Sequence, residues 1–143
     1  MKKLLRIFVL VGLLAISGLA LAAQTATQPI IIHGMLVRPS LTSSTFTFVL
    51  DRKTVTSISY LSEPDRVIVE FTNAKPKFAM HNAKLGGANV SKMDTRAMPN
   101  DEFQYIFYVT GRPTWKAGYL PPQKNEKGVR FELTITSPSE IKR

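Results

Sequence analysis

The chain contains no cysteine and only two histidines among its 143 residues. Without cysteine, neither a disulfide nor a lipid-modified cysteine can stabilise or anchor it, so a hydrophobic core must hold the fold together. A zinc hydrolase would need several His and acidic ligands around an open coordination position. His33 and His81 are too few for such a site, and they suit ordinary polar positions in a strand and in a loop.

Motifs of catalytic or phosphate-binding sites are also missing. No G-x-S-x-G nucleophile elbow occurs, and no serine, threonine or aspartate stands in a pattern that pairs it with a base. Gly86 and Gly87 form an isolated pair with no helical pattern behind them, which indicates a turn or bulge rather than a phosphate cradle. We therefore expect no enzymatic activity, no cofactor and no metal.

Acidic residues are scarce, with 10 Asp and Glu against 19 Lys and Arg, and the net charge is +9. The basic residues are scattered rather than gathered into a stripe with interleaved aromatics, which argues against a nucleic-acid partner. Such a charge suits contact with the anionic polymers and lipids of a cell envelope, and it serves solubility equally well.

Long apolar runs are absent except at the start, MKKLLRIFVLVGLLAISGLALAAQ. Three basic residues, an apolar run and a small-residue end are typical of a secretory signal peptide, here residues 1–22, cut after Ala22 or Ala23. Glycine and serine interrupt the run, which is marginal for a hydrocarbon layer of about 30 Å, so an uncleaved inner-membrane anchor is the lesser alternative. We expect a periplasmic protein with no membrane span after cleavage, a linker at 23–29, one domain at 30–136 and a polar tail at 137–143.

The two halves of this domain resemble each other. Residues 46–71 align with residues 105–133. The offset is 59 residues up to and including a shared Tyr-Leu pair, and beyond that pair the second copy carries a three-residue insertion. Upstream, MLVR at 35–38 matches MDTR at 93–96. In this alignment Pro64-Asp65-Arg66 has no counterpart.

Apolar residues recur at every second position in segments that are bounded by turn residues, and this pattern predicts four strands in each copy. The expected strands are 30–37, 45–50, 55–61 and 66–72, then 88–95, 104–110, 114–120 and 128–136. The fold class is therefore all-β, a β-sandwich of two related, mostly antiparallel sheets from an internal duplication, with one sheet from each copy. Trp115 is expected to fill the core, and alternation assigns twelve further side chains to it: Phe46, Phe48, Leu50, Val67, Val69, Phe71, Tyr105, Phe107, Val109, Val129, Phe131 and Leu133.

The segment FVLDRKTVTSISYLSEPDRVIVEFTNAKP resembles the AMIN domain, whose pattern combines an aromatic-leucine pair, a Pro-Asp-Arg turn and an alternating strand that ends in an acidic residue. LGGANVSKMDTRAMPNDEFQYIFYVTG is similar to the family's second half. The family occurs beside cell-wall amidases and type IV pilus secretins and binds peptidoglycan. The resemblance implies a non-catalytic, periplasmic, peptidoglycan-binding module that localises or scaffolds an envelope machine, such as a pilus secretin or a division or amidase complex.

Outward-facing polar side chains are the candidates for ligand contact, because arginine forks onto carboxylates and tyrosine stacks on sugar faces. For Arg66 the alternative is a structural role in the turn, paired with Glu70 or Asp65. If the outward apolar residues form one patch, they favour a protein partner, so the alternative function is an adaptor that binds a secretin or divisome protein through a sheet face or edge strand. The candidate ligand-binding residues are Arg38, Arg66, Glu70, Arg96, Tyr108 and Arg130.

Overall fold

The computed structural model describes residues 28–78, 80, 83–85 and 89–138. Several sequence predictions fall outside the described residues: the signal peptide and its cleavage site, most of the linker at 23–29, His81, the Gly86-Gly87 pair and most of the polar tail.

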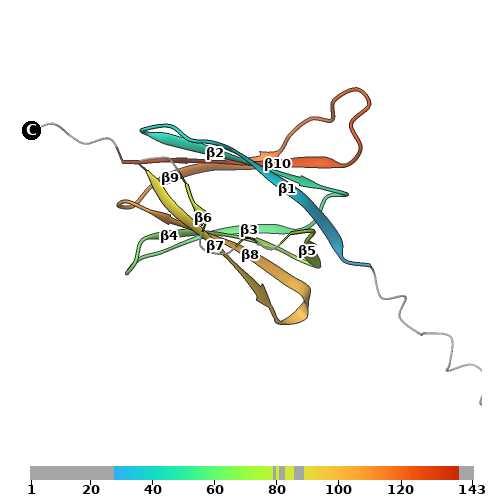
Figure 1. The fold of residues 1–143 in the computed structure, drawn as a ribbon, viewed down its shortest axis with the longest axis horizontal. Coiled ribbons are helices and arrows are strands. Elements are labelled where there is room, and N and C mark those ends of the chain that lie inside the picture. Colours follow the sequence, from blue (N-terminus) through green and yellow to red (C-terminus); the bar gives the residue numbers. More distant parts are fainter. Residues whose placement is uncertain (1–27, 79, 81–82, 86–88, 139–143) are drawn as a thin grey trace, which may run out of the picture.

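Within the described residues, the chain forms two stacked sheets of five strands each (Figure 1). Sheet I has the strand order β5-β1-β2-β10-β9, and sheet II has the order β3-β4-β8-β7-β6. Every pairing is antiparallel except β1 with β5. The predicted all-β sandwich is confirmed. Its elements are β1 (Ile30–Arg38), β2 (Ser43–Leu50), β3 (Thr56–Leu61), β4 (Arg66–Phe71), β5 (Ala74–Pro76), β6 (Ala83–Lys84), β7 (Val90–Met98), the 3₁₀ turn η1 (Pro99–Asp101), β8 (Glu102–Val109), β9 (Thr114–Tyr119) and β10 (Val129–Thr136).

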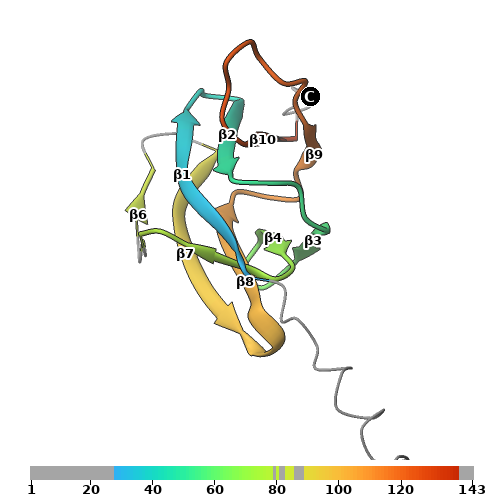
Figure 2. The ribbon, with the colours of Figure 1, turned by 90° about the vertical axis from the view of Figure 1, so that its right-hand side faces the viewer.

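The prediction that each copy supplies one sheet is wrong. The first copy places β1 and β2 in sheet I and β3 and β4 in sheet II, while the second places β7 and β8 in sheet II and β9 and β10 in sheet I. The pairs β2–β10 and β4–β8 therefore join the two copies at the centre of each sheet (Figure 2). Alternation fixes which face of a strand is buried, but it does not choose the strand's neighbour, so the sequence pattern could not show this exchange of hairpins.

The strand registers also correct the alignment of the two copies. Phe48 lies opposite Phe131 in sheet I, and Phe107, the counterpart of Phe48, lies opposite Val67 in sheet II. Val67 is therefore the counterpart of Phe131, and the second copy carries a five-residue insertion instead of three. A shift of two residues leaves every inward side chain inward, so alternation alone could not detect the error.

This correction changes which polar residues correspond. Arg66 has a counterpart after all, Arg130, and Glu70 corresponds to Thr134 rather than to Glu132. The outer faces of the two sheets can thus be compared position by position.

Both copies contain a β-bulge at the same place. The pairing of β1 with β2 shifts around His33, and the pairing of β7 with β8 shifts around Ser91. A bulge inserts one unpaired residue and bends its strand. Because the two bulges stand at corresponding positions, the duplication extends to irregular backbone, and His33 is an exposed bulge residue.

Aromatic side chains of both sheets interdigitate in the core. The ring of Phe48 stands edge-on to those of Phe71 and Tyr105, with centroids 5.1 and 4.8 Å away. Of the twelve predicted core residues, ten are buried, and Val109 and Val129 are partly buried against them. The expectation for Trp115 is wrong, because it lies on the edge strand β9 and is 40% exposed.

One buried polar residue ties the sheets together. Asn89, which precedes β7 of sheet II, is 2% exposed. Its Oδ1 accepts a hydrogen bond from the Ser44 hydroxyl at 2.6 Å, and its Nδ2 donates to the carbonyl oxygen of Ile135 at 2.9 Å, both in sheet I. A buried amide must be satisfied in this way, since an unpaired buried polar group costs about 1–3 kcal/mol.

Candidate functional site

The six candidate residues lie on two different surfaces. Four of them, Arg66, Glu70, Arg96 and Tyr108, share the outer face of sheet II. Arg38 and Arg130 lie on the outer face of sheet I, on the opposite side of the sandwich. The structure therefore brings together four of the predicted residues and separates the other two from them.

A groove of about 370 Å³ crosses the outer face of sheet II. We call it the sheet II groove. It runs over β4, β8 and β7, and its lining residues are Leu61, Pro64, Arg66, Ile68, Arg96, Met98, Gln104, Ile106 and Tyr108.

Strand pairing sets the layout of this groove. Arg66 lies opposite Tyr108 near one end, and Arg96 lies opposite Gln104 near the other. Between them, Ile68 lies opposite Ile106. Although both isoleucines face outward, they are only 9% and 6% exposed and lie outside the main core, so they form an apolar floor beneath longer neighbours.

Gln104 and Lys92 are members of this surface that the sequence did not single out. The Gln104 amide donates a 2.6 Å hydrogen bond to a carboxylate oxygen of Glu70. The Lys92 ammonium stands 4.3 Å from the ring centroid of Tyr108, within the range of a cation–π interaction. Gln104 could have been found from the alternation that places Ile106 and Tyr108 outward, whereas Lys92 required the pairing of β7 with β8.

The polar contacts of Arg66 differ from both expected pairings. Its Nη1 donates to the carbonyl oxygen of Pro64 at 3.1 Å, in the turn that enters β4. Asp65 instead accepts a hydrogen bond from the Tyr60 hydroxyl, which raises the pKa of Tyr60, and Glu70 is held by Gln104. Within the described part of the chain, the guanidinium of Arg66 forms no ion pair.

Two arginines supply all the formal charge that lines the sheet II groove. The lining contains Arg66 and Arg96 and no acidic residue. The carboxylate of Glu70, on the same face, is already engaged by Gln104. The groove is therefore cationic at both ends and apolar in the middle.

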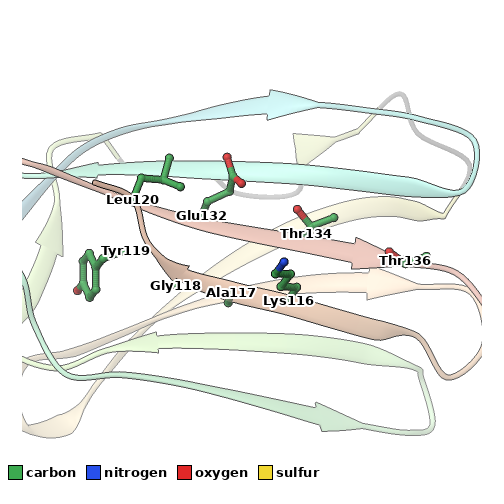
Figure 3. A pocket seen from close by; sticks show the side chains of 8 residues that line it. All are labelled: Lys116, Ala117, Gly118, Tyr119, Leu120, Glu132, Thr134 and Thr136. Carbon is green, nitrogen blue, oxygen red and sulfur yellow. The ribbon is translucent and has the colours of Figure 1, made fainter. Parts of the chain in front are cut away.

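The outer face of sheet I has a hollow of a different character (Figure 3). It measures about 510 Å³ and lies beside β9, where Gly118 has no side chain to fill the space between Lys116 and Leu120. Lys116 and Glu132, of opposite charge, both line it. Its remaining lining residues are Ala117, Tyr119, Thr134 and Thr136.

The arginine on this face is neutralised by a carboxylate. Nε of Arg130 donates a hydrogen bond to Glu126, and the two form an ion pair. The pKa of Glu126 is lowered, first by the hydrogen bond that it accepts from the backbone N–H of Gln123 and then by Arg130. Arg130 is thereby tied to the loop before β10.

Strand β9 forms an open edge of sheet I. Residues 114–118 are exposed, and β9 pairs only with β10 among the described strands. The N–H of Leu120, just after β9, bonds to Arg130 of β10, so by strand periodicity the N–H of Ala117 points away from the sheet. An edge strand with a free row of backbone groups is a template for pairing with another chain.

No protein-family model matches the chain, and a search of curated proteins returns no relative. Among the described residues, no helix is long and apolar enough to cross a membrane. The fold defines the class of the protein as a duplicated β-sandwich with hairpins exchanged between its sheets.

Proposed function

We propose that the protein is a non-catalytic periplasmic module that binds peptidoglycan through the sheet II groove. Through this binding it localises or scaffolds an envelope machine, such as a pilus secretin or a division or amidase complex. The groove is the observation that carries the proposal. It combines two arginines, a partly exposed tyrosine ring, an amide and an apolar floor on one sheet face.

The chemistry of the groove suits an extended polymer of sugars and peptides. A sugar ring can stack on the face of Tyr108, and its apolar side can lie over Ile68 and Ile106. Arginine provides forked donors for carboxylates. Because the groove lies across a sheet face, a long polymer can enter and leave it at both ends, which a closed small-molecule pocket would not allow.

Co-sedimentation of the mature protein with purified sacculi tests this function. The protein is expected to pellet with sacculi at low salt, and Tyr108→Ala is expected to weaken binding several-fold, because an aromatic contact contributes about 0.5–1.5 kcal/mol beyond its area. Val49→Ala is the matched control, since Val49 is the counterpart of Tyr108 on sheet I. Absence of the wild-type protein from the pellet would overturn the proposal.

A second candidate function is favoured by the free edge of β9. An adaptor could accept an extended segment of a secretin or divisome protein as an additional strand, with one of its side chains seated in the hollow over Gly118. The exposed Trp115 on the same strand is consistent with a covered surface, because tryptophan is enriched at interfaces.

Ala117→Pro separates this second function from the first. Proline removes the outward N–H of Ala117 without removing a bond to β10, so strand addition should be lost while the fold and sacculus binding are retained. Cross-linking in envelope extracts, with wild-type and variant protein side by side, measures the difference. Equal recovery of the same partner with both proteins would exclude β9 as the contact.

A further inference from the structure

We propose that the sheet II groove recognises the carboxylates of peptidoglycan stem peptides, and that the corresponding face of sheet I does not. Arg66 and Arg96 are the two anion contacts. This inference rests on the proposed function and specifies which part of the polymer is read, and by which of the two related faces.

The duplication provides a comparison within one molecule. Arginines occur at corresponding positions on both faces, with Arg66 matching Arg130 and Arg96 matching Arg38. The positions between the arginines differ on the two faces. Sheet II carries apolar or aromatic side chains there, and sheet I carries shorter or acidic ones. The corresponding pairs are Ile68 and Glu132, Ile106 and Thr47, and Tyr108 and Val49.

The charges on the two faces have diverged as well. On sheet I, Arg130 is paired with Glu126, and Glu132 places a carboxylate among the hollow's lining residues. On sheet II, neither arginine forms an ion pair with another described residue. The carboxylates nearby are engaged, Glu70 by Gln104 and Asp94 Oδ1 by the N–H of Thr95 at 2.8 Å. A carboxylate ligand in the sheet II groove therefore meets two arginines and no acidic lining residue, whereas on sheet I Arg130 is already paired and Glu132 lines the hollow.

The positions of the two arginines suit a ligand with spaced anionic groups. The residues opposite them on β8, Tyr108 and Gln104, are four residues apart, which is about 13 Å along the strand. Arg66 and Arg96 are also two strands apart, or about 10 Å across the sheet. Peptidoglycan carries carboxylates repeatedly along its peptides, so one segment can contact both ends of the groove.

The groove is less suited to a phosphate-bearing lipid surface. Docking on a bilayer requires apolar side chains that protrude into the headgroup region. Leu61 on the edge strand β3 is 44% exposed, but a single leucine offers little area for insertion, and Ile68 and Ile106 are only 9% and 6% exposed and form the groove floor. A ligand that lies within the groove can contact this floor, whereas a flat membrane cannot.

Four forms of the full mature chain test the assignment: wild type, Arg66→Gln, Arg96→Gln and Arg38→Gln. Each substitution removes one positive charge, and Arg38 is the exposed counterpart of Arg96 on the other face. Losing a charged hydrogen bond costs about 1.5–3 kcal/mol, so Arg66→Gln and Arg96→Gln are each expected to bind sacculi at least about tenfold more weakly. Arg38→Gln should stay within about twofold of wild type.

The ligand is varied in the same assay. Sacculi whose carboxyl groups have been converted to amides should lose most of the binding that mock-treated sacculi retain. Equal binding to amidated sacculi, or equal losses for Arg38→Gln and Arg96→Gln, would overturn this inference while leaving peptidoglycan binding intact. Arginine-dependent binding of similar strength to anionic phosphatidylglycerol vesicles would assign the groove to lipid phosphate instead. Failure of wild type to bind untreated sacculi would overturn the proposed function itself.

Discussion

Replacing Phe107 with alanine is expected to lower the free energy of unfolding by about 3–5 kcal/mol, the usual cost of truncating a buried phenylalanine. The side chain of Phe107 is fully buried, and its ring centroid is 4.2 Å from that of Phe46 in the other sheet. It lies between Val67 and Met93 on the neighbouring strands of its own sheet. The cavity left by the truncation would therefore lie between the two sheets, where the surrounding structure can relax only partly to fill it. Urea denaturation followed by circular dichroism measures the loss.

Phe78→Ala is the matched control for this prediction. The same atoms are removed, but Phe78 is 69% exposed, so the change should stay within about 0.5 kcal/mol, as at most surface sites. Similar losses for Phe78→Ala and Phe107→Ala would show that the interior of the sandwich is not where these strand faces place it.

Gly128→Ala is expected to destabilise the fold by about 2–6 kcal/mol, the sum of strain in a disfavoured backbone conformation and of steric overlap. Gly128 has a φ of +98°, which side-chain-bearing residues rarely adopt. A Cβ at this position would stand 2.3 Å from the carbonyl oxygen of Leu50, an atom of the β2 backbone that has no flexible side chain to move aside. Thermal or urea denaturation of the variant tests this directly.

Gly118→Ala serves as the comparison, because Gly118 has no atom within 4 Å of the added Cβ and no positive φ. Its stability should change by less than about 1 kcal/mol, in either direction. If Gly128→Ala proved as mild as Gly118→Ala, the turn into β10 would have to differ from the one described.

The sequence predicted the eight longer strands and their buried faces because both depend on local alternation, whereas β5 and β6, of three and two residues, are too short to show it. Successive side chains of a strand point to opposite faces, so Phe107 is inward and Tyr108 is outward. This alternation can be read from the sequence without knowing which strand is the neighbour. For this reason the outward positions of Arg66 and Tyr108 could be predicted. Their place in one groove could not be predicted in this way, since it requires β4 to lie beside β8, and β8 beside β7.

The buried link through Asn89 shows the same limit. The two partners of its side chain, Ser44 and Ile135, lie in the other sheet and are more than 40 residues from Asn89 along the chain. Nothing in the local pattern around Asn89 distinguishes a buried asparagine from one in an exposed turn. Trp115 is the opposite case, because its size suggested the core, but the exposed edge position of β9 decided its environment.

What the sequence alone determined was the all-β class, the duplication and the inward set of side chains, since these follow from periodicity and from similarity between two segments. Only the tertiary structure decided that the copies exchange hairpins, that Arg66 corresponds to Arg130, and that four of the six candidate residues share one face. The reason is physical. Side-chain alternation is unchanged when a strand shifts by two residues or changes its neighbour, whereas backbone hydrogen bonds and core packing distinguish these arrangements.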